Sequence, residues 1–274
     1  MRSELLNAEE ERVAVRVKAA PCLYTTRLQK GGAMLVEMRQ LVRRWNDGPL
    51  QPQRDLIVRE NVLSKSTRAR TADVLRRSFL PRFVEGPIPE AWKLVRPLED
   101  AGAALPILRP VYYWITAKAE LMLGDFCREY LLTHQAIAYA GIGLPEVLHW
   151  LHKKNCHWSP TVSSKVARGL LAALRDFGIL EGRAKKRLAN ISVPVSAFAY
   201  VAFCLHQMGA VARSLVSHED WGLFLLQPSD VEHLFFVAHQ HRLLEYHAAG
   251  STVSIRFGVN SFTQYAQIVV ERSN

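Results

Sequence analysis

The sequence of 274 residues predicts a mainly α-helical protein with two helical lobes. Along most of the chain, apolar residues recur at spacings of three and four, which is the period of an amphipathic helix. Breaker motifs, such as Asn-Asp-Gly-Pro at 46–49 and Gly-Ile-Gly at 141–143, separate these stretches. Strand-like segments are expected in two short stretches of the C-terminal half, near residues 179–193 and 243–257.

Four regions are expected along the chain. Residues 1–23 would form an N-terminal arm, 24–135 an N-terminal helical domain, 136–195 a winged helix-turn-helix, and 196–274 a C-terminal helical region with a β-hairpin. Within the N-terminal domain, helices are predicted over residues 24–45, 52–63, 66–79, 89–100, 105–122 and 125–134.

Two glycines stand inside the first of these predicted helices. Gly31 and Gly32 each cost roughly 1 kcal/mol of helix stability relative to alanine. They therefore indicate close packing or a kink at that point.

The segment from Trp158 to Val193 predicts a helix, a basic loop and short flanking strands. Ser159 can cap the helix, Pro160 suits its first position, and Gly178 suits the left-handed residue that ends it. The apolar stripe that would face the core consists of residues spaced by four: Val162, Val166, Leu170 and Leu174.

Neighbouring segments complete the pattern of a winged helix-turn-helix. Residues 144–153 would form the preceding helix, 155–158 the turn, and 181–187 (EGRAKKR) a basic tip between the strands. In this motif the second helix enters the DNA major groove and the basic wing lies on phosphates. A second helix–helix–hairpin order, at 221–257, lacks the basic tip and predicts a smaller winged-helix-like hairpin unit used for packing.

Positive charge is concentrated in two blocks of the chain. The net charge is +10 and the pI is near 9.7, which favours an acidic partner, nucleic acid first and an anionic membrane surface second. Residues 39–82 contain eleven cations against four acids, and residues 153–187 contain nine against two. After residue 187, four cations face six acids. The C-terminal third is therefore expected to pack internally or to contact a protein.

The candidate DNA-binding residues follow from these blocks. One face of the 160–176 helix carries small, hydroxylated and cationic side chains without a carboxylate. A solvated face of an ordinary α+β element is the alternative there, and basic surface helices of a bundle are the alternative for the arginine-rich helix near residue 70. The candidates are Thr161, Ser164, Lys165, Arg168 and Arg175 on the helix, Arg183, Lys185, Lys186 and Arg187 on the wing, Lys153 and Lys154 before them, and Arg68, Arg70, Arg76 and Arg77.

Metal sites, cofactor sites and catalytic sites are not expected. The four cysteines lie outside any C-x-x-C pair, which disfavours a disulfide framework or a zinc ribbon, and isolated thiols suit a reducing cytosol. The cluster HWLHKKNCH at 149–157 has no second ligand pair at finger-like spacing, so we interpret it as histidines beside a basic patch. Phosphate-binding glycine motifs and nucleophile elbows do not occur.

Membrane and secretory segments are not expected either. The N-terminus carries Glu9, Glu10 and Glu11 and has no apolar leader core. The longest uncharged run, 188–212, is interrupted by polar residues, and its helical part, 197–208, is too short to cross a bilayer. We interpret it as a buried core helix of a cytoplasmic protein.

Several stretches in order resemble one protein family. They are YTTRLQKGGAMLVEMRQLVRRW, ENVLSKSTRARTADVLRRSFLPR, SPTVSSKVARGLLAALRDFGIL, SAFAYVAFCLHQMG, HEDWGLFLLQPSDVEHLF and STVSIRF. Together they resemble the BrxA family of bacterial BREX phage-exclusion systems over residues 24–257. The resemblance implies a small, mainly helical cytosolic protein that is associated with DNA binding and has no recognised catalytic residues, so no catalytic residue is carried over.

The expected function is that of a non-enzymatic component of a phage-defence system that binds double-stranded DNA, largely through the backbone. A scaffold that contacts other subunits of the defence system through its basic faces is an alternative. A transcription regulator with a defined operator is another. The sequence leaves the DNA site, the oligomeric state and the partner subunits open.

Overall fold

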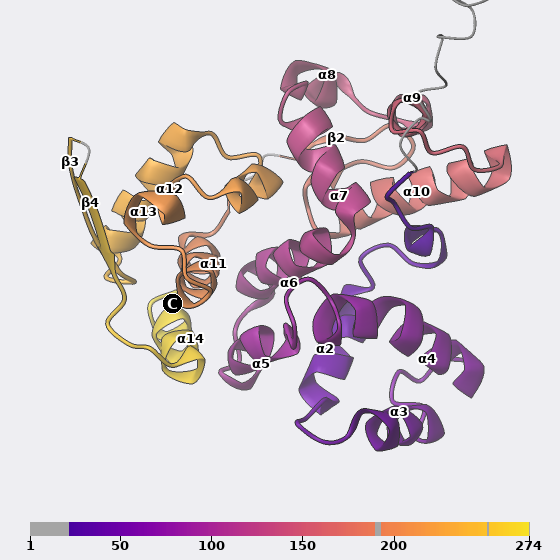
Figure 1. Ribbon diagram of the computed structural model, residues 1–274, viewed down its shortest axis with the longest axis horizontal. Helices are drawn as coiled ribbons and strands as arrows, with labels where there is room; N and C mark the ends of the chain where they lie inside the picture. The colour runs from indigo at the N-terminus through magenta and orange to yellow at the C-terminus, as the bar shows by residue number, and fades with distance from the viewer. Residues whose placement is uncertain (1–21, 190–192, 251, 274) are drawn as a thin grey trace, which may run out of the picture.

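The computed structural model describes residues 22–189, 193–250 and 252–273 (Figure 1). In these residues the chain is mainly helical, as predicted, and its strands form two short antiparallel hairpins. The predicted N-terminal arm lies outside the described residues except for its last two positions. The boundaries of the four predicted regions stay predictions.

The N-terminal part of the chain is a series of helices, of which α2, α3 and α4 lie at the lower right of Figure 1 and α6 lies near the centre. Thr67 caps α4, because its hydroxyl accepts a hydrogen bond from the backbone N–H of Arg70. The elements are η1 (Arg27–Lys30), α2 (Leu35–Arg44), α3 (Leu50–Arg59), α4 (Arg68–Val74), η2 (Leu75–Val84), α5 (Trp92–Asp100), α6 (Leu105–Ala119), α7 (Leu121–Asp125) and η3 (Phe126–Leu131).

The middle of the chain contains the long helix α10, which crosses the upper right of Figure 1 with α9 next to it. Both helices have the bounds that the sequence predicted. The Ser159 hydroxyl accepts a hydrogen bond from the N–H of Val162, and Gly178 ends the helix at a φ of 80°. The elements here are α8 (Gln135–Ala140), α9 (Leu144–Lys153), α10 (Pro160–Asp176), β1 (Leu180–Glu181) and β2 (Arg187–Leu188).

The C-terminal part lies on the left of Figure 1 and packs on the rest through α11 and α14. The hairpin of β3 and β4 pairs Glu245 with Arg256 at one end and Ala249 with Thr252 at the other. The elements are α11 (Val195–Gln207), α12 (Ala212–Val216), η4 (Glu219–Phe224), α13 (Pro228–Gln240), β3 (Glu245–Ala249), β4 (Thr252–Arg256) and α14 (Phe262–Glu271).

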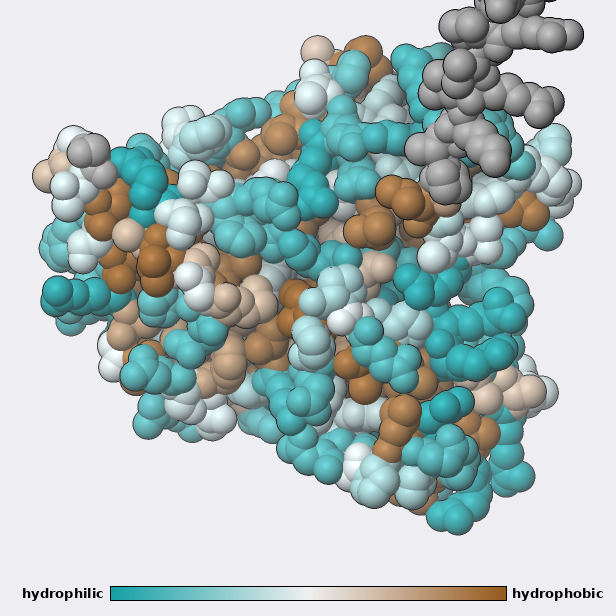
Figure 2. Space-filling view, in the orientation of Figure 1, coloured by the Kyte–Doolittle hydropathy of each residue, from teal (hydrophilic) through white to brown (hydrophobic). Residues whose placement is uncertain are grey.

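The hydrophobic core runs through the centre of the molecule, where α6 and α11 pack against each other. Every residue of α11 from 197 to 205 is buried, as expected for a core helix rather than a membrane span. Within the described ranges, no helix combines the length and the apolar character that crossing a lipid bilayer requires. On the face shown in Figure 2, apolar residues form separate groups among hydrophilic ones.

Among the described residues three carboxylates are buried, Glu99, Glu120 and Asp220, and the first two bind arginines from the N-terminal segments. Glu120, between α6 and α7, accepts hydrogen bonds from the buried Arg82 of η2, at 3.0 Å, and from Arg27 of η1, at 3.3 Å. Glu99 of α5 accepts from Arg39 at 2.7 Å and from Arg43 at 2.8 Å. Each carboxylate therefore joins helices that are distant in sequence.

Hydrogen bonds keep Glu99 ionised although it is buried. Burial by itself raises the pKa of this carboxyl, but hydrogen bonds from Arg39, Arg43 and Tyr112 lower it by more, so the pKa lies below its ordinary value. This interaction stabilises the fold above the ordinary carboxyl pKa and is lost as the pH falls through the lowered value.

The predicted helix over 24–45 was wrong in its first half. The structure has only the single turn η1, then an irregular stretch, and α2 begins after Met34, which adopts a left-handed conformation with a φ of 51°. The reason is close packing at Gly32, where an added Cβ would lie 3.0 Å from the backbone nitrogen of Ala173 in α10. The chain leaves the helical path so that its backbone can lie against α10.

The expectation of four isolated thiols was also wrong. Cys22 and Cys156 form a disulfide across a sequence separation of 134 residues. Their spacing gave no sign of this pairing, because it depends on the folded chain bringing η1 beside α10. Cys127 and Cys204 are free and buried, and burial raises the pKa of the Cys127 thiol to about 12.

We expect Glu120→Leu to lower the free energy of unfolding by about 3–5 kcal/mol, because it leaves Arg82 buried without a carboxylate. Urea unfolding followed by circular dichroism measures the change. Glu60→Ala is the matched control, since it breaks the exposed pair with Arg44 and should cost about 0–1 kcal/mol. Equal losses in the two variants would contradict a structural role for the buried pair.

Candidate nucleic-acid interface

The outward face of α10 carries five of the fifteen side chains that the sequence assigned to DNA binding. Thr161, Lys165, Arg168 and Arg175 are exposed, and Ser164 is half-buried on the same side. Of the four residues predicted to face the core, Val166, Leu170 and Leu174 are buried, and Val162 is half-buried against the core. The predicted separation of the two faces is therefore present in the structure.

The cations on this face differ in whether they form an ion pair within the protein. Arg175 forms an ion pair with its neighbour Asp176 at 2.7 Å. Lys165 and Arg168 have no ion pair with any carboxylate in the described part of the chain. These two cations are thus available to an external anion.

The turn that leads into α10 is held by several contacts. Asn155 has a φ of 56°, and the following Cys156 is tied to Cys22. Lys154 pairs with Glu129 and lies 5.8 Å from the centre of the Trp150 ring, while Lys153 is exposed.

Because Cys156 is used in the disulfide, it is not free to join its neighbouring histidines as a metal ligand. In the described residues, no group of three or more potential ligands comes together.

The basic tip after α10 is a short antiparallel hairpin that a third segment joins. Leu180 pairs with Leu188, and Ile142, which precedes α9, forms an antiparallel bridge with Lys186. Arg183 and Lys185 are exposed at the tip.

The prediction that all four tip cations face solvent was wrong for Lys186. Lys186 is 8% exposed, and its ammonium donates a hydrogen bond to the backbone oxygen of Arg183 at 2.7 Å. Burial, followed by the nearby charge of Arg175, lowers its pKa. Arg187 is exposed but pairs with Glu181 across the hairpin at 2.7 Å. Side chains alternate between the two faces of an extended segment, so Lys186, which precedes β2, points inward while Arg187 points to solvent.

One side of α10 is covered by η1. At Gly169, an added Cβ would overlap the backbone oxygen of Leu28, so only a glycine permits this approach. Lys30, the last residue of η1, lies 3.9 Å from Asp73 of α4. The turn η1 thus lies between α10 and α4, and it brings the two basic blocks to neighbouring elements (Figure 1).

The four arginines after residue 67 differ in whether they form an ion pair. Arg76 and Arg77 lie in η2 and pair with Asp73 at 3.7 and 2.5 Å. Arg68 and Arg70, at the start of α4, are exposed and have no ion pair within the described chain. These two are therefore the cations of this segment that are open to a partner.

A groove of about 500 Å³ between α3 and α4 adds residues that the candidate set lacked. Arg54 and Arg59 line it together with Arg68. Asp55 also lines the groove, but it accepts a hydrogen bond from the Gln51 side chain and forms no ion pair with these arginines within the described residues. Whether these arginines are paired depends on the fold, so their spacing in the sequence did not identify them.

Comparison with known proteins supplies a family and a similar fold. The model of the family described as BrxA matches residues 23–203. Among solved structures, the chain is similar to the crystal structure of an uncharacterized protein from Magnetospirillum magneticum, with a TM-score of 0.54 and 17% identity. That match covers 73% of this chain and 97% of the other, and at this identity it concerns the fold alone. No curated protein matches the chain.

We expect Gly169→Ala to destabilise the protein, although alanine is the better helix former by about 1 kcal/mol. The added methyl group would push η1 away from α10, and such overpacking costs about 1–3 kcal/mol. Thermal melting measures the effect. Gly258→Ala is the control, since an added Cβ there meets nothing within 4 Å. A rise in melting temperature for Gly169→Ala would show that η1 does not press on α10.

Proposed function

Because this chain belongs to the BrxA family, which is associated with bacterial BREX phage-exclusion systems, we propose that it is a double-stranded DNA-binding component of such a system. It acts without catalysis and binds the duplex in the cytoplasm through α10 and the β1–β2 wing. The observation that carries the proposal is the exposed face of α10, where Lys165 and Arg168 have no internal ion pair.

The order of elements supports a winged helix-turn-helix. The chain passes from α8 through the bridge at Ile142 to α9, α10, β1 and β2. In this arrangement α10 is the recognition helix, and its N-terminal residues, such as Thr161 and Lys165, approach base edges. Arg183 and Lys185 at the wing tip contact phosphates, which position the helix without reading sequence.

The arginines of the N-terminal helices add further contacts to DNA. Arg54, Arg59 and Arg68 line one groove, and η1 connects their element to α10. A duplex that lies on α10 meets this groove as a second set of phosphate contacts. Binding is therefore dominated by the backbone, and sequence preference is weak.

A second candidate function is that of a scaffold for other subunits of the defence system. Exposed apolar side chains favour it, namely Ile137 and Tyr139 on α8, with 48% and 57% of their surface accessible. These residues lie beside the wing, since α8 packs against β2. A scaffold would show no salt-dependent affinity for free DNA.

We expect the protein to bind duplex DNA with an affinity that falls steeply with salt. If about six phosphates are neutralised, log K falls against log salt with a slope of about −5. Electrophoretic shift titrations at several salt concentrations measure the slope, and competition by random duplex separates this function from that of an operator-specific regulator. Absence of binding at low salt would contradict the proposal and favour the scaffold.

We expect a double dissociation between the two faces of α10. Arg168→Ala should lower DNA affinity by about 1–3 kcal/mol if it contacts a base, and by less if it contacts a phosphate, with folding intact. Leu170→Ala should cost about 2–5 kcal/mol of stability through the cavity that it leaves. Melting and binding curves on both variants decide the matter. If Arg168→Ala unfolds the protein, the assignment of the two faces is wrong.

We expect the wing to contribute through its exposed, unpaired cations. Replacing Arg183 and Lys185 with alanine should weaken binding to every duplex and make the salt slope less steep by about two, because two phosphate contacts are lost. The melting temperature should change little. Arg187→Ala is the matched control, since Arg187 is already paired with Glu181. Unchanged binding by the double variant would mean that the wing does not touch DNA.

A further inference from the structure

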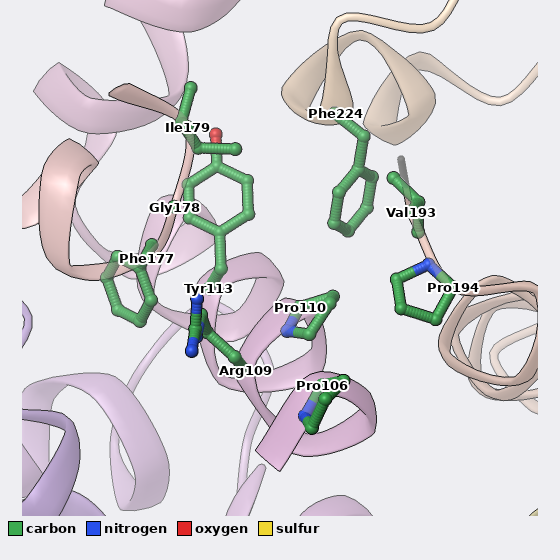
Figure 3. Close-up of a pocket in the computed structure, with 10 residues that line it drawn as sticks. All are labelled: Pro106, Arg109, Pro110, Tyr113, Phe177, Gly178, Ile179, Val193, Pro194 and Phe224. Carbon is green, nitrogen blue, oxygen red and sulfur yellow. The ribbon is translucent and has the colours of Figure 1, made fainter. Parts of the chain in front are cut away.

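A cavity of about 240 Å³ opens where three parts of the chain meet (Figure 3). Helix α6 contributes Pro106, Arg109, Pro110 and Tyr113 along one side. The end of α10 and the start of β1 contribute Phe177, Gly178 and Ile179, and the opposite wall consists of Phe224 from η4 with Val193 and Pro194, which precede α11. None of these features takes part in the DNA-binding surface described above.

The cavity contains one ionised group, and that group has no internal partner. The Nε atom of Arg109 is buried and makes no hydrogen bond, and its guanidinium forms no ion pair with a carboxylate of the described residues. Arg109 differs from Arg82 in the core, because Arg109 is only half-buried, whereas Arg82 is fully enclosed and pairs with Glu120. A buried donor without an acceptor carries a desolvation penalty, and the penalty is larger when the group is charged. An external anion at Arg109 would supply the acceptor that its Nε lacks among the described residues.

Most of the side chains around Arg109 are apolar, and three of them are aromatic. The rings of Phe177 and Phe224 lie 5.3 and 5.6 Å from the ring of Tyr113, measured between centroids. The Tyr113 hydroxyl is engaged elsewhere, since it donates to the backbone oxygen of Leu223 at 2.7 Å. No carboxylate lines the cavity among the described residues. The cavity thus offers a single cation within apolar surroundings.

We propose that this cavity binds a small organic monoanion, in which one carboxylate meets Arg109 and a flat apolar body lies among the aromatic and proline side chains. A guanidinium matches the planar geometry of a carboxylate. A small number of polar groups in a mainly apolar cleft is the usual pattern of a small-molecule site. Inorganic phosphate fits less well, because the walls offer no second cation and would leave most of its oxygens without donors.

Gly178 lies close to the guanidinium of Arg109. An added Cβ at this residue would lie 3.2 Å from Nη1 of Arg109, and the φ of 80° is itself one that disfavours other residues. The same residue that ends α10 therefore borders the cavity. A bound ligand would contact α6, the end of α10 and the segment before α11 at once, so it would hold these three parts together.

The test uses the full chain and benzoate and phenylacetate as probes, with benzamide and inorganic phosphate as comparisons. Isothermal titration and thermal shift measure binding. We expect the carboxylates to bind and to raise the melting temperature, and benzamide to bind about tenfold more weakly or not at all, because it lacks the charge-assisted hydrogen bond. Absence of carboxylate binding at millimolar concentration, equal binding of benzamide, or tighter binding of phosphate would each overturn the proposal.

Arg109→Gln should reduce benzoate affinity by about tenfold or more. Arg256→Gln, at an exposed position on β4 outside the cavity, should leave it unchanged. A second measurement does not depend on either variant folding: in the wild-type protein, nuclear Overhauser effects should join the benzoate ring protons to the methyl groups of Ile179 and Val193, which line the cavity. Retained affinity in Arg109→Gln, or contacts only to other methyl groups, would show that benzoate binds elsewhere.

Discussion

The carboxylate of Glu120 is the interaction on which the arrangement of the candidate interface depends. It accepts hydrogen bonds from Arg82 of η2 and Arg27 of η1. Both arginines lie far from it in sequence, so one buried charge fixes the N-terminal segments against α6 and α7. The segment that Arg27 anchors is the one that packs on α10 at Gly169. The position of the proposed recognition helix is therefore linked to an ion pair in the core.

The sequence identified the elements in which local signals and tertiary packing agree. The cap at Ser159, the apolar spacing of four and Gly178 together placed α10 correctly, and the long uncharged stretch placed the core helix α11. The stretch before α2 was wrongly predicted as helix. Its apolar residues do have helical spacing, but the close contact of Gly32 with the backbone of α10 determines the path of the chain there. The disulfide of Cys22 had no local signal, since it arises only when two distant segments meet.

Counting charges along the chain overstated the cations that a partner can reach. In the first basic block, Arg39 and Arg43 neutralise Glu99, and Arg82 neutralises Glu120, so these arginines stabilise the interior. In the second block Lys186 is turned inward. Residue type and spacing located helix α10 and the hairpin after it, but the inward position of Lys186 depends on its bridge to Ile142. Such pairing is a property of the folded chain alone.

The disulfide between Cys22 and Cys156 changes the unfolded chain more than the folded one. It closes a loop that contains η1, the N-terminal helices and α9, and the conformational entropy removed from the unfolded chain grows with loop length. For a loop of about 100 residues this is worth about 4.7 kcal/mol in the chain-entropy model, and the separation here is 134 residues. The oxidised protein thus resists unfolding partly because its unfolded state is confined. In a reducing cytosol the same sequence would have to fold without that advantage, on the strength of its core.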